Sequence, residues 1–98
     1  MTRARKIDAN QPEIVAALRA AGASVLFLHT VGNGCPDILA GYRGQNVLIE
    51  IKDHRKPRSR RVLTPDEAEF HRTWSGQVGV AETVDDALMM IGAVGVTL

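Results

Sequence analysis

Two short β-prone runs on either side of a glycine-containing turn constrain the fold of this chain most strongly. They cover residues 37–42 and 46–52, and the connection Arg43-Gly44-Gln45-Asn46 supplies the Gly and Asn that hairpin turns favour. In the second run the odd-numbered side chains are apolar and point to one face. The even-numbered side chains point to the other face: Leu48, Glu50 and Lys52. The pattern predicts an antiparallel β-hairpin.

Charged side chains gather at the open end of this hairpin. If the turn is centred between Arg43 and Gly44, Asp37 lies opposite Glu50, and a register with the pairing sum shifted by two places it opposite Lys52 instead. In either register the three side chains share one face, because the side-chain period of a strand is two. We therefore expect two carboxylates about 5 Å apart with an ammonium group beside them.

Two adjacent carboxylates suit a divalent cation. Mg2+ takes oxygen ligands and is typically held by one or two carboxylates, with water and substrate phosphate as the other ligands. Such an ion can activate water against a phosphodiester, and a neighbouring lysine can stabilise the transition state. The alternative interpretation is structural: Asp37 is a turn residue, and Glu50 and Lys52 are an exposed pair in which the lysine is only a counter-ion.

The residues before the hairpin predict a helix and a strand. Apolar side chains recur at helical spacing over residues 9–22. This helix begins either with a capping box of Asp8 and Gln11 or with Pro12 in its first turn. Residues 24–30 are apolar and β-prone, so they predict a strand.

The residues after the hairpin predict a polar loop, a helix, a strand and a last helix. The loop covers residues 53–63, and Thr64 and Glu67 then form the signature of a capping box. Phe70 and Trp74 lie one turn apart and are expected to face the core. A strand over residues 77–82 and a helix over residues 83–93 follow. The expected fold is an αβββαβ core of the α/β class, with a mixed central sheet flanked by helices and a C-terminal helix.

Length and composition fit one domain without a membrane segment. The chain has 98 residues, enough for a single core over about residues 8–93. No apolar run approaches the roughly 20 residues that span a bilayer. One cysteine and no secretory signal predict a cytoplasmic location. The histidines and Cys35 lack the spacing of a zinc site, and without a Gly-rich phosphate loop no nucleotide cofactor is expected.

Positive charge is concentrated in the loop that follows the hairpin. Residues 1–61 hold 11 Lys and Arg against 5 Asp and Glu, a net +6, whereas residues 62–98 hold 1 against 6, a net −5. A basic run predicts a polyanionic partner, although a solvated loop has the same composition. The candidate nucleic-acid contacts are Lys52, His54, Arg55, Lys56, Arg58, Arg60 and Arg61.

These residues together resemble a known nuclease motif. Pro36-Asp37, a gap of 12 residues and Glu50-Ile51-Lys52 resemble the PD-(D/E)xK motif of restriction-endonuclease-like enzymes. The longer segments GCPDILAGYRGQNVLIEIK and LTPDEAEFHRTW are similar to the VRR-NUC branch, and the resemblance covers about residues 8–90. It implies a Mg2+- or Mn2+-dependent deoxyribonuclease with a restriction-endonuclease-like core, acting in a bacterial cell or a phage-infected host.

The resemblance also implies roles for single residues. Asp37 and Glu50 would hold the metal together with the backbone carbonyl of Ile51, and Lys52 would be the catalytic lysine. Glu13 matches a further acidic ligand on the first helix, although the helix dipole alone also favours a carboxylate there. Family members often carry Gln in the second helix where this chain has Glu67, whose alternative role is the capping box alone.

The substrate and the assembly are likewise implied by the resemblance. Stand-alone relatives often cut branched DNA such as four-way (Holliday) junctions as homodimers, which suits a twofold-symmetric cut. The candidate contact surface is Met89-Met90-Ile91, which is more apolar than one inner stripe requires. The alternatives are a nonspecific nuclease, a phage nuclease that cuts flaps or nicks DNA, and a non-catalytic nucleic-acid-binding accessory protein.

Overall fold

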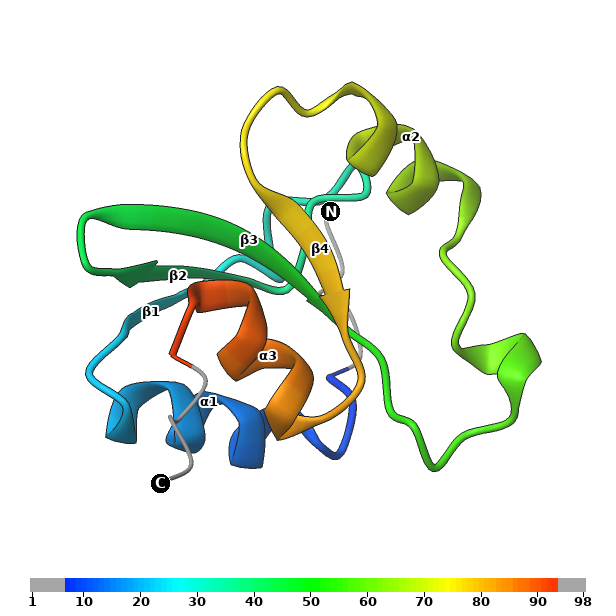
Figure 1. Ribbon diagram of the computed structural model, residues 1–98. Helices are drawn as coiled ribbons and strands as arrows, with labels where there is room; N and C mark the ends of the chain where they lie inside the picture. Colours follow the sequence, from blue (N-terminus) through cyan, green and yellow to red (C-terminus); the bar gives the residue numbers. More distant parts are fainter. Residues whose placement is uncertain (1–6, 94–98) are drawn as a thin grey trace.

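The computed structural model describes residues 7–93. It confirms the α/β class, with a mixed four-stranded sheet, helices against the sheet and a C-terminal helix (Figure 1). The elements are α1 (Gln11–Ala20), β1 (Ser24–Phe27), β2 (Ile38–Tyr42), β3 (Gln45–Ile51), the 3-10 turn η1 (Arg58–Arg60), α2 (Pro65–Thr73), β4 (Val78–Ala81) and α3 (Val84–Ile91).

The sheet is built around the predicted hairpin. Its strand order is β1-β2-β3-β4, with antiparallel pairing from β1 to β3 and parallel pairing between β3 and β4. The two turn residues, Arg43 and Gly44, have φ angles of 50° and 78°. Positive φ at both central positions is the geometry of a type I′ turn, whose twist matches the flanking strands. This turn fixes the register with Ile38 opposite Ile49.

The apolar core lies on one face of the sheet, beneath α1 and α3 (Figure 1). It includes Ile14 and Leu18 from α1, Ile38 and Ile49 from the hairpin, and Ala87 from α3, each with 0% exposure. These positions follow the predicted periodicities, 3.6 in the helices and 2 in the strands. Of the two predicted helix starts, the structure has the second: Pro12 lies in the first turn of α1, and the Asp8 carboxylate pairs with Lys56 instead of forming a capping box.

Helix α2 lies on the opposite face of the sheet (Figure 1). The expectation that Phe70 and Trp74 face the core is wrong. Their rings stack with centroids 5.1 Å apart, and Trp74 is 48% exposed. With Leu39 and Leu48 they line an apolar groove of about 520 Å³ on the face away from the core. Helical spacing placed the two rings on one face of α2 but did not indicate which layer that face meets.

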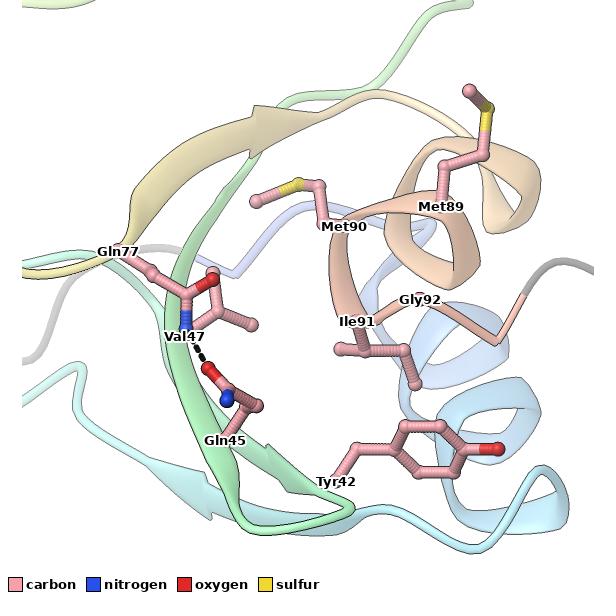
Figure 2. A pocket seen from close by; sticks show the side chains of 8 residues that line it. All are labelled: Tyr42, Gln45, Val47, Gln77, Met89, Met90, Ile91 and Gly92. Atoms are coloured by element: carbon pink, nitrogen blue, oxygen red, sulfur yellow. Dashed lines mark hydrogen bonds between the residues drawn. The ribbon is translucent and has the colours of Figure 1, made fainter.

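A second pocket, of about 250 Å³, lies at the turn end of the hairpin, between the sheet and the end of α3 (Figure 2). Its lining includes all three residues of the stretch expected as a dimer surface, Met89, Met90 and Ile91. Met90 points toward the sheet in Figure 2, and Ile91 is buried, so Met89, 64% exposed, is the one side chain of the three that faces solvent. Among residues 7–93, no helix is long and apolar enough to cross a membrane.

Candidate active site

Two carboxylates meet at the open end of the hairpin. The register that pairs Ile38 with Ile49 places Asp37 opposite Glu50, the first of the two predicted alternatives. Directly opposed residues have Cβ atoms about 5 Å apart, and alternation puts both side chains on the face away from the core. Both are buried, with 6% exposure for Asp37 and 2% for Glu50. The interpretation of Glu50 as an exposed surface residue is therefore wrong.

Backbone groups hold Asp37 in place. Its carboxylate accepts a hydrogen bond of 2.7 Å from the Ile51 N–H, and its carbonyl accepts one of 2.8 Å from the Leu28 N–H. The side chain thus lies across the end of β3, and the Ile51 side chain points to the core with 1% exposure. These bonds orient the carboxylate before any ligand binds.

Lys52 extends from the end of β3 on the same face and is 8% exposed. Its ammonium group donates a hydrogen bond of 2.8 Å to Glu67 Oε1 and lies 3.6 Å from Glu50 Oε2. Burial lowers the pKa of this lysine, but the hydrogen bond to Glu67 raises it. The negative charges of Glu50, Glu67 and Asp37 raise it further. The net effect is a pKa above its ordinary value, so Lys52 is a cation at neutral pH.

Glu67 comes into the site from the first turn of α2. The predicted capping box is present: the Thr64 N–H donates to Glu67 Oε1 at 2.9 Å, and Thr64 Oγ1 accepts from the Glu67 N–H at 3.2 Å. The side chain is 5% exposed, although it belongs to a helix with few buried residues. Glu67 is thus the capping-box residue and also the partner of Lys52.

Asn10 is a buried residue at this site that the sequence did not reveal. Its side-chain amide donates hydrogen bonds of 3.0 Å to the carbonyls of Lys52 and Glu82, and it is 1% exposed. One amide therefore joins the ends of β3 and β4 to the start of α1. Asparagine before a helix predicts an N-cap, but this side chain makes no capping bond. No local pattern signals a contact across 42 residues.

Glu13 does not join the two carboxylates. Its side chain is exposed on the first turn of α1, and its negative charge contributes to the raised pKa of Arg55 in the basic loop. Within residues 7–93, no group of three His, Cys, Asp or Glu side chains is arranged to hold a metal ion. A metal at this site would rely on Asp37 and Glu50 as its acidic side chains.

The basic loop leaves the site at the end of β3 and extends away from the sheet (Figure 1). Three of its cations form ion pairs: Arg55 with Asp53, Lys56 with Asp8, and Arg61 with Glu82. His54 is half-exposed, with Nδ1 3.2 Å from the Glu82 carbonyl.

Two further cations, Arg58 and Arg60, lie on η1. Both are exposed, and neither forms an ion pair with another residue of the range 7–93. Among the cations of the basic loop, these two are the most available to a polyanion.

The donor set fits a hard divalent cation. Asp37, Glu50 and Glu67 are carboxylates and Lys52 is an ammonium, so the four side chains carry a formal charge of three negatives and one positive. One or two carboxylate ligands are the usual protein contribution to a Mg2+ site, and Mn2+ accepts the same oxygen donors. No family model matches this chain, and no curated protein matches it significantly.

Proposed function

We propose that this protein is a metal-dependent DNA endonuclease of the VRR-NUC type, which hydrolyses phosphodiester bonds. One observation carries the proposal: two buried carboxylates and a buried ammonium share one face at the open end of a hairpin. Burying several charges is costly unless they are paired or coordinate a metal. A purely structural role does not require an acid pair at a strand end beside a basic loop.

Asp37 and Glu50 would hold Mg2+ or Mn2+. The carbonyl of Ile51 is a third candidate oxygen, because the N–H and C=O of one strand residue point to the same side and this N–H donates to Asp37. A cation bound there would supply Lewis-acid activation of water and of the phosphodiester. Glu13 is exposed and is not included in this proposed ligand set.

Lys52 would act on the phosphodiester itself. Its raised pKa keeps the side chain charged, and its ammonium lies 3.6 Å from the Glu50 carboxylate. A fixed positive charge next to the reacting phosphate stabilises the negative charge that develops in the transition state. Because the side chain is buried and hydrogen-bonded, little reorientation is needed.

DNA would approach along the basic loop. Arg58 and Arg60 offer exposed charge for backbone phosphates, a mode of contact that does not read sequence. We infer that the preferred substrate is branched DNA such as a four-way junction and that a homodimer makes the paired cuts. Support for these two points comes from the resemblance and from the small surface that 98 residues offer to a junction.

Cleavage of synthetic DNA tests the proposal. A labelled four-way junction, a flap and a linear duplex of matched sequence are incubated with the protein with and without Mn2+. We expect Mn2+-dependent cleavage that is fastest on the junction. Asp37→Asn and Lys52→Met should each reduce the rate by about 100-fold or more, because each removes one charge from the reacting centre. Asp85→Asn makes the same chemical change as Asp37→Asn on the exposed side of α3 and serves as the matched control.

Three outcomes decide between the candidate functions. Intact DNA on every substrate with Mn2+, together with tight DNA binding, would favour the accessory binding protein. Cleavage that is equal on junction, flap and duplex would favour a nonspecific nuclease. Sedimentation of the protein with a junction gives the stoichiometry, and one monomer per junction would contradict the homodimer.

A further inference from the structure

We propose that Glu67 is a positioning residue that holds the Lys52 ammonium beside Glu50 and so keeps the carboxylate pair available to the cation. The inference rests on the proposed function, since it assigns a task within that site. In this proposal a single oxygen of Glu67 has two roles: it accepts the capping hydrogen bond at the start of α2, and it positions the ammonium group of Lys52.

The geometry of Glu67 is fixed by its own helix. Glu67 Oε1 accepts from the Thr64 N–H at 2.9 Å and from Lys52 Nζ at 2.8 Å. The return bond from the Glu67 N–H to Thr64 Oγ1 closes the capping box at 3.2 Å. A side chain held at both ends in this way has little rotamer freedom. The acceptor oxygen therefore occupies a defined point beside the hairpin.

A tertiary contact fixes α2 itself against the loop that leads to Asp37. Gly34 lies so close to the first turn of α2 that a Cβ atom added there would be 2.2 Å from the Asp66 carbonyl oxygen. The start of α2 is therefore seated on the segment that delivers Asp37. The positions of Asp37 and Glu67 are coupled through this contact, although 30 residues separate them along the chain.

The ammonium group of Lys52 lies within ion-pair distance of two carboxylates, those of Glu67 and Glu50. The flexible stem of the lysine places the ammonium 2.8 Å from Glu67 and 3.6 Å from Glu50. Without the acceptor on α2, the nearest remaining carboxylate is that of Glu50. An ammonium group that closes on Glu50 competes with a cation for the same oxygens. Loss of Glu67 should therefore weaken metal binding as well as misplace the lysine.

Two substitutions at position 67 separate the acceptor from the bulk of the side chain. Glu67→Met keeps the length but removes the oxygen, and it should weaken Mn2+ binding by about 10-fold and lower kcat by a similar factor. Glu67→Gln keeps an oxygen that can accept from both Thr64 and Lys52, so it should restore both values to within about threefold of the wild type. Mn2+ affinity is measured by calorimetry without DNA, and kcat and KM are measured on the cleaved substrate.

The matched control is Thr83→Ala, which removes the N-cap hydrogen bond of α3 from Asp86 N–H at 3.1 Å. The substitution removes a capping hydrogen bond comparable to the one at the start of α2, but from a helix end outside the site. It should therefore lower Tm but leave Mn2+ affinity and kcat near their wild-type values. If Glu67→Met does not fold, Glu67→Asp keeps the charge but shortens the side chain by one methylene. It must then show the same loss of Mn2+ affinity.

A double variant shows whether Glu67 acts through Lys52. In a Lys52→Met background the ammonium is absent, so adding Glu67→Met should not weaken Mn2+ binding further. Mn2+ affinity in Glu67→Met equal to that of Thr83→Ala, or an additive loss in the double variant, would overturn the inference. A wild-type protein that neither binds Mn2+ nor cleaves DNA would overturn the proposed function as well.

Discussion

At the residue scale, the start of the basic loop depends on one buried carboxylate. Asp53 is 4% exposed and accepts hydrogen bonds from the Arg55 backbone N–H at 3.0 Å and from Arg55 Nε at 2.9 Å. The side-chain hydrogen bond from Arg55, the backbone bond and the positive charge together lower the pKa of Asp53 from 3.8 to about 2. The first loop residues after β3 are therefore held by an acid that stays ionised in mild acid.

This pKa predicts a specific acid sensitivity. The folded-state value lies below the ordinary one, so the stability that Asp53 contributes is present above about pH 4 and is lost as the pH falls toward about 2. The side chain at position 53 does not titrate in the variant Asp53→Asn. The urea midpoint of this variant should therefore fall less steeply than that of the wild type between pH 5 and pH 2.5. Asp85→Asn, at an exposed site, should parallel the wild type. Equal slopes in all three proteins would contradict the role given to Asp53.

Some residues of the candidate site could be predicted from the sequence, and others could not. Asp37, Glu50 and Lys52 were predictable because strand alternation places them on one face whichever register forms. Asn10 and the contact between Lys52 and Glu67 depend on tertiary packing. The burial of Glu67 was not predictable either, because a capping box is usually read as a surface feature.

At the scale of elements, the first turn of α2 matters most, since it carries Glu67. Gly34 has φ +77° and leaves no room for a Cβ, whereas Gly32 has φ +83° and nothing within 4 Å. Alanine at either position is strained by about 1 kcal/mol, because both lie in the left-handed region. Alanine at Gly34 would in addition displace the start of α2, because its Cβ would overlap the backbone of Asp66.

Gly34→Ala should therefore lower both Tm and the cleavage rate more than Gly32→Ala. The second variant carries the same backbone strain without the clash, so the difference between the two isolates the close approach to α2. Thermal unfolding followed by circular dichroism gives Tm, and the junction assay gives the rate. The same Tm and the same rate in the two variants would show that α2 does not depend on this contact.

Elements whose signals are local were predicted well, and elements whose ends depend on packing were not. The I′ turn at Arg43 and Gly44 and the cap at Thr64 follow from chemistry within a few residues. The strand expected over residues 24–30 ends at Phe27, because the ladder between β1 and β2 ends at the pair Phe27 and Ile38. Beyond that pair the Leu28 N–H still donates to the Asp37 carbonyl. The aromatic face of α2 lines the groove on the side of the sheet away from the core, and periodicity alone does not indicate which layer a helix face meets.

At the scale of the whole molecule, charge is distributed around the site in two ways. The site itself is acidic and buried, whereas the exposed Arg58 and Arg60 lie on a turn that extends from the sheet (Figure 1). The net charge of +1 conceals this separation. In the proposed function this separation would let the loop hold a polyanion while the carboxylates hold a cation.

The double variant Arg58→Gln/Arg60→Gln tests the loop. Each lost phosphate contact should reduce the slope of log affinity against log salt by about 0.9 on duplex DNA, or by about 1.8 for the pair. Arg72→Gln, which removes a cation that pairs with Glu69 on the exposed side of α2, should leave the slope unchanged. The slopes are measured by fluorescence anisotropy in Ca2+ over a KCl series. A wild-type slope in the double variant would place DNA binding elsewhere.

The proposed hydrolysis requires a cation site between Asp37 and Glu50. The direct measurement is the anomalous diffraction of a crystal soaked in Mn2+, recorded for the wild type and for Asp37→Asn. We expect one strong peak in contact with the carboxylates of Asp37 and Glu50, close to Lys52 but not bound by it, and no such peak in the variant. A soaked crystal without density at this pair, or with the same peak in Asp37→Asn, would contradict the proposed chemistry.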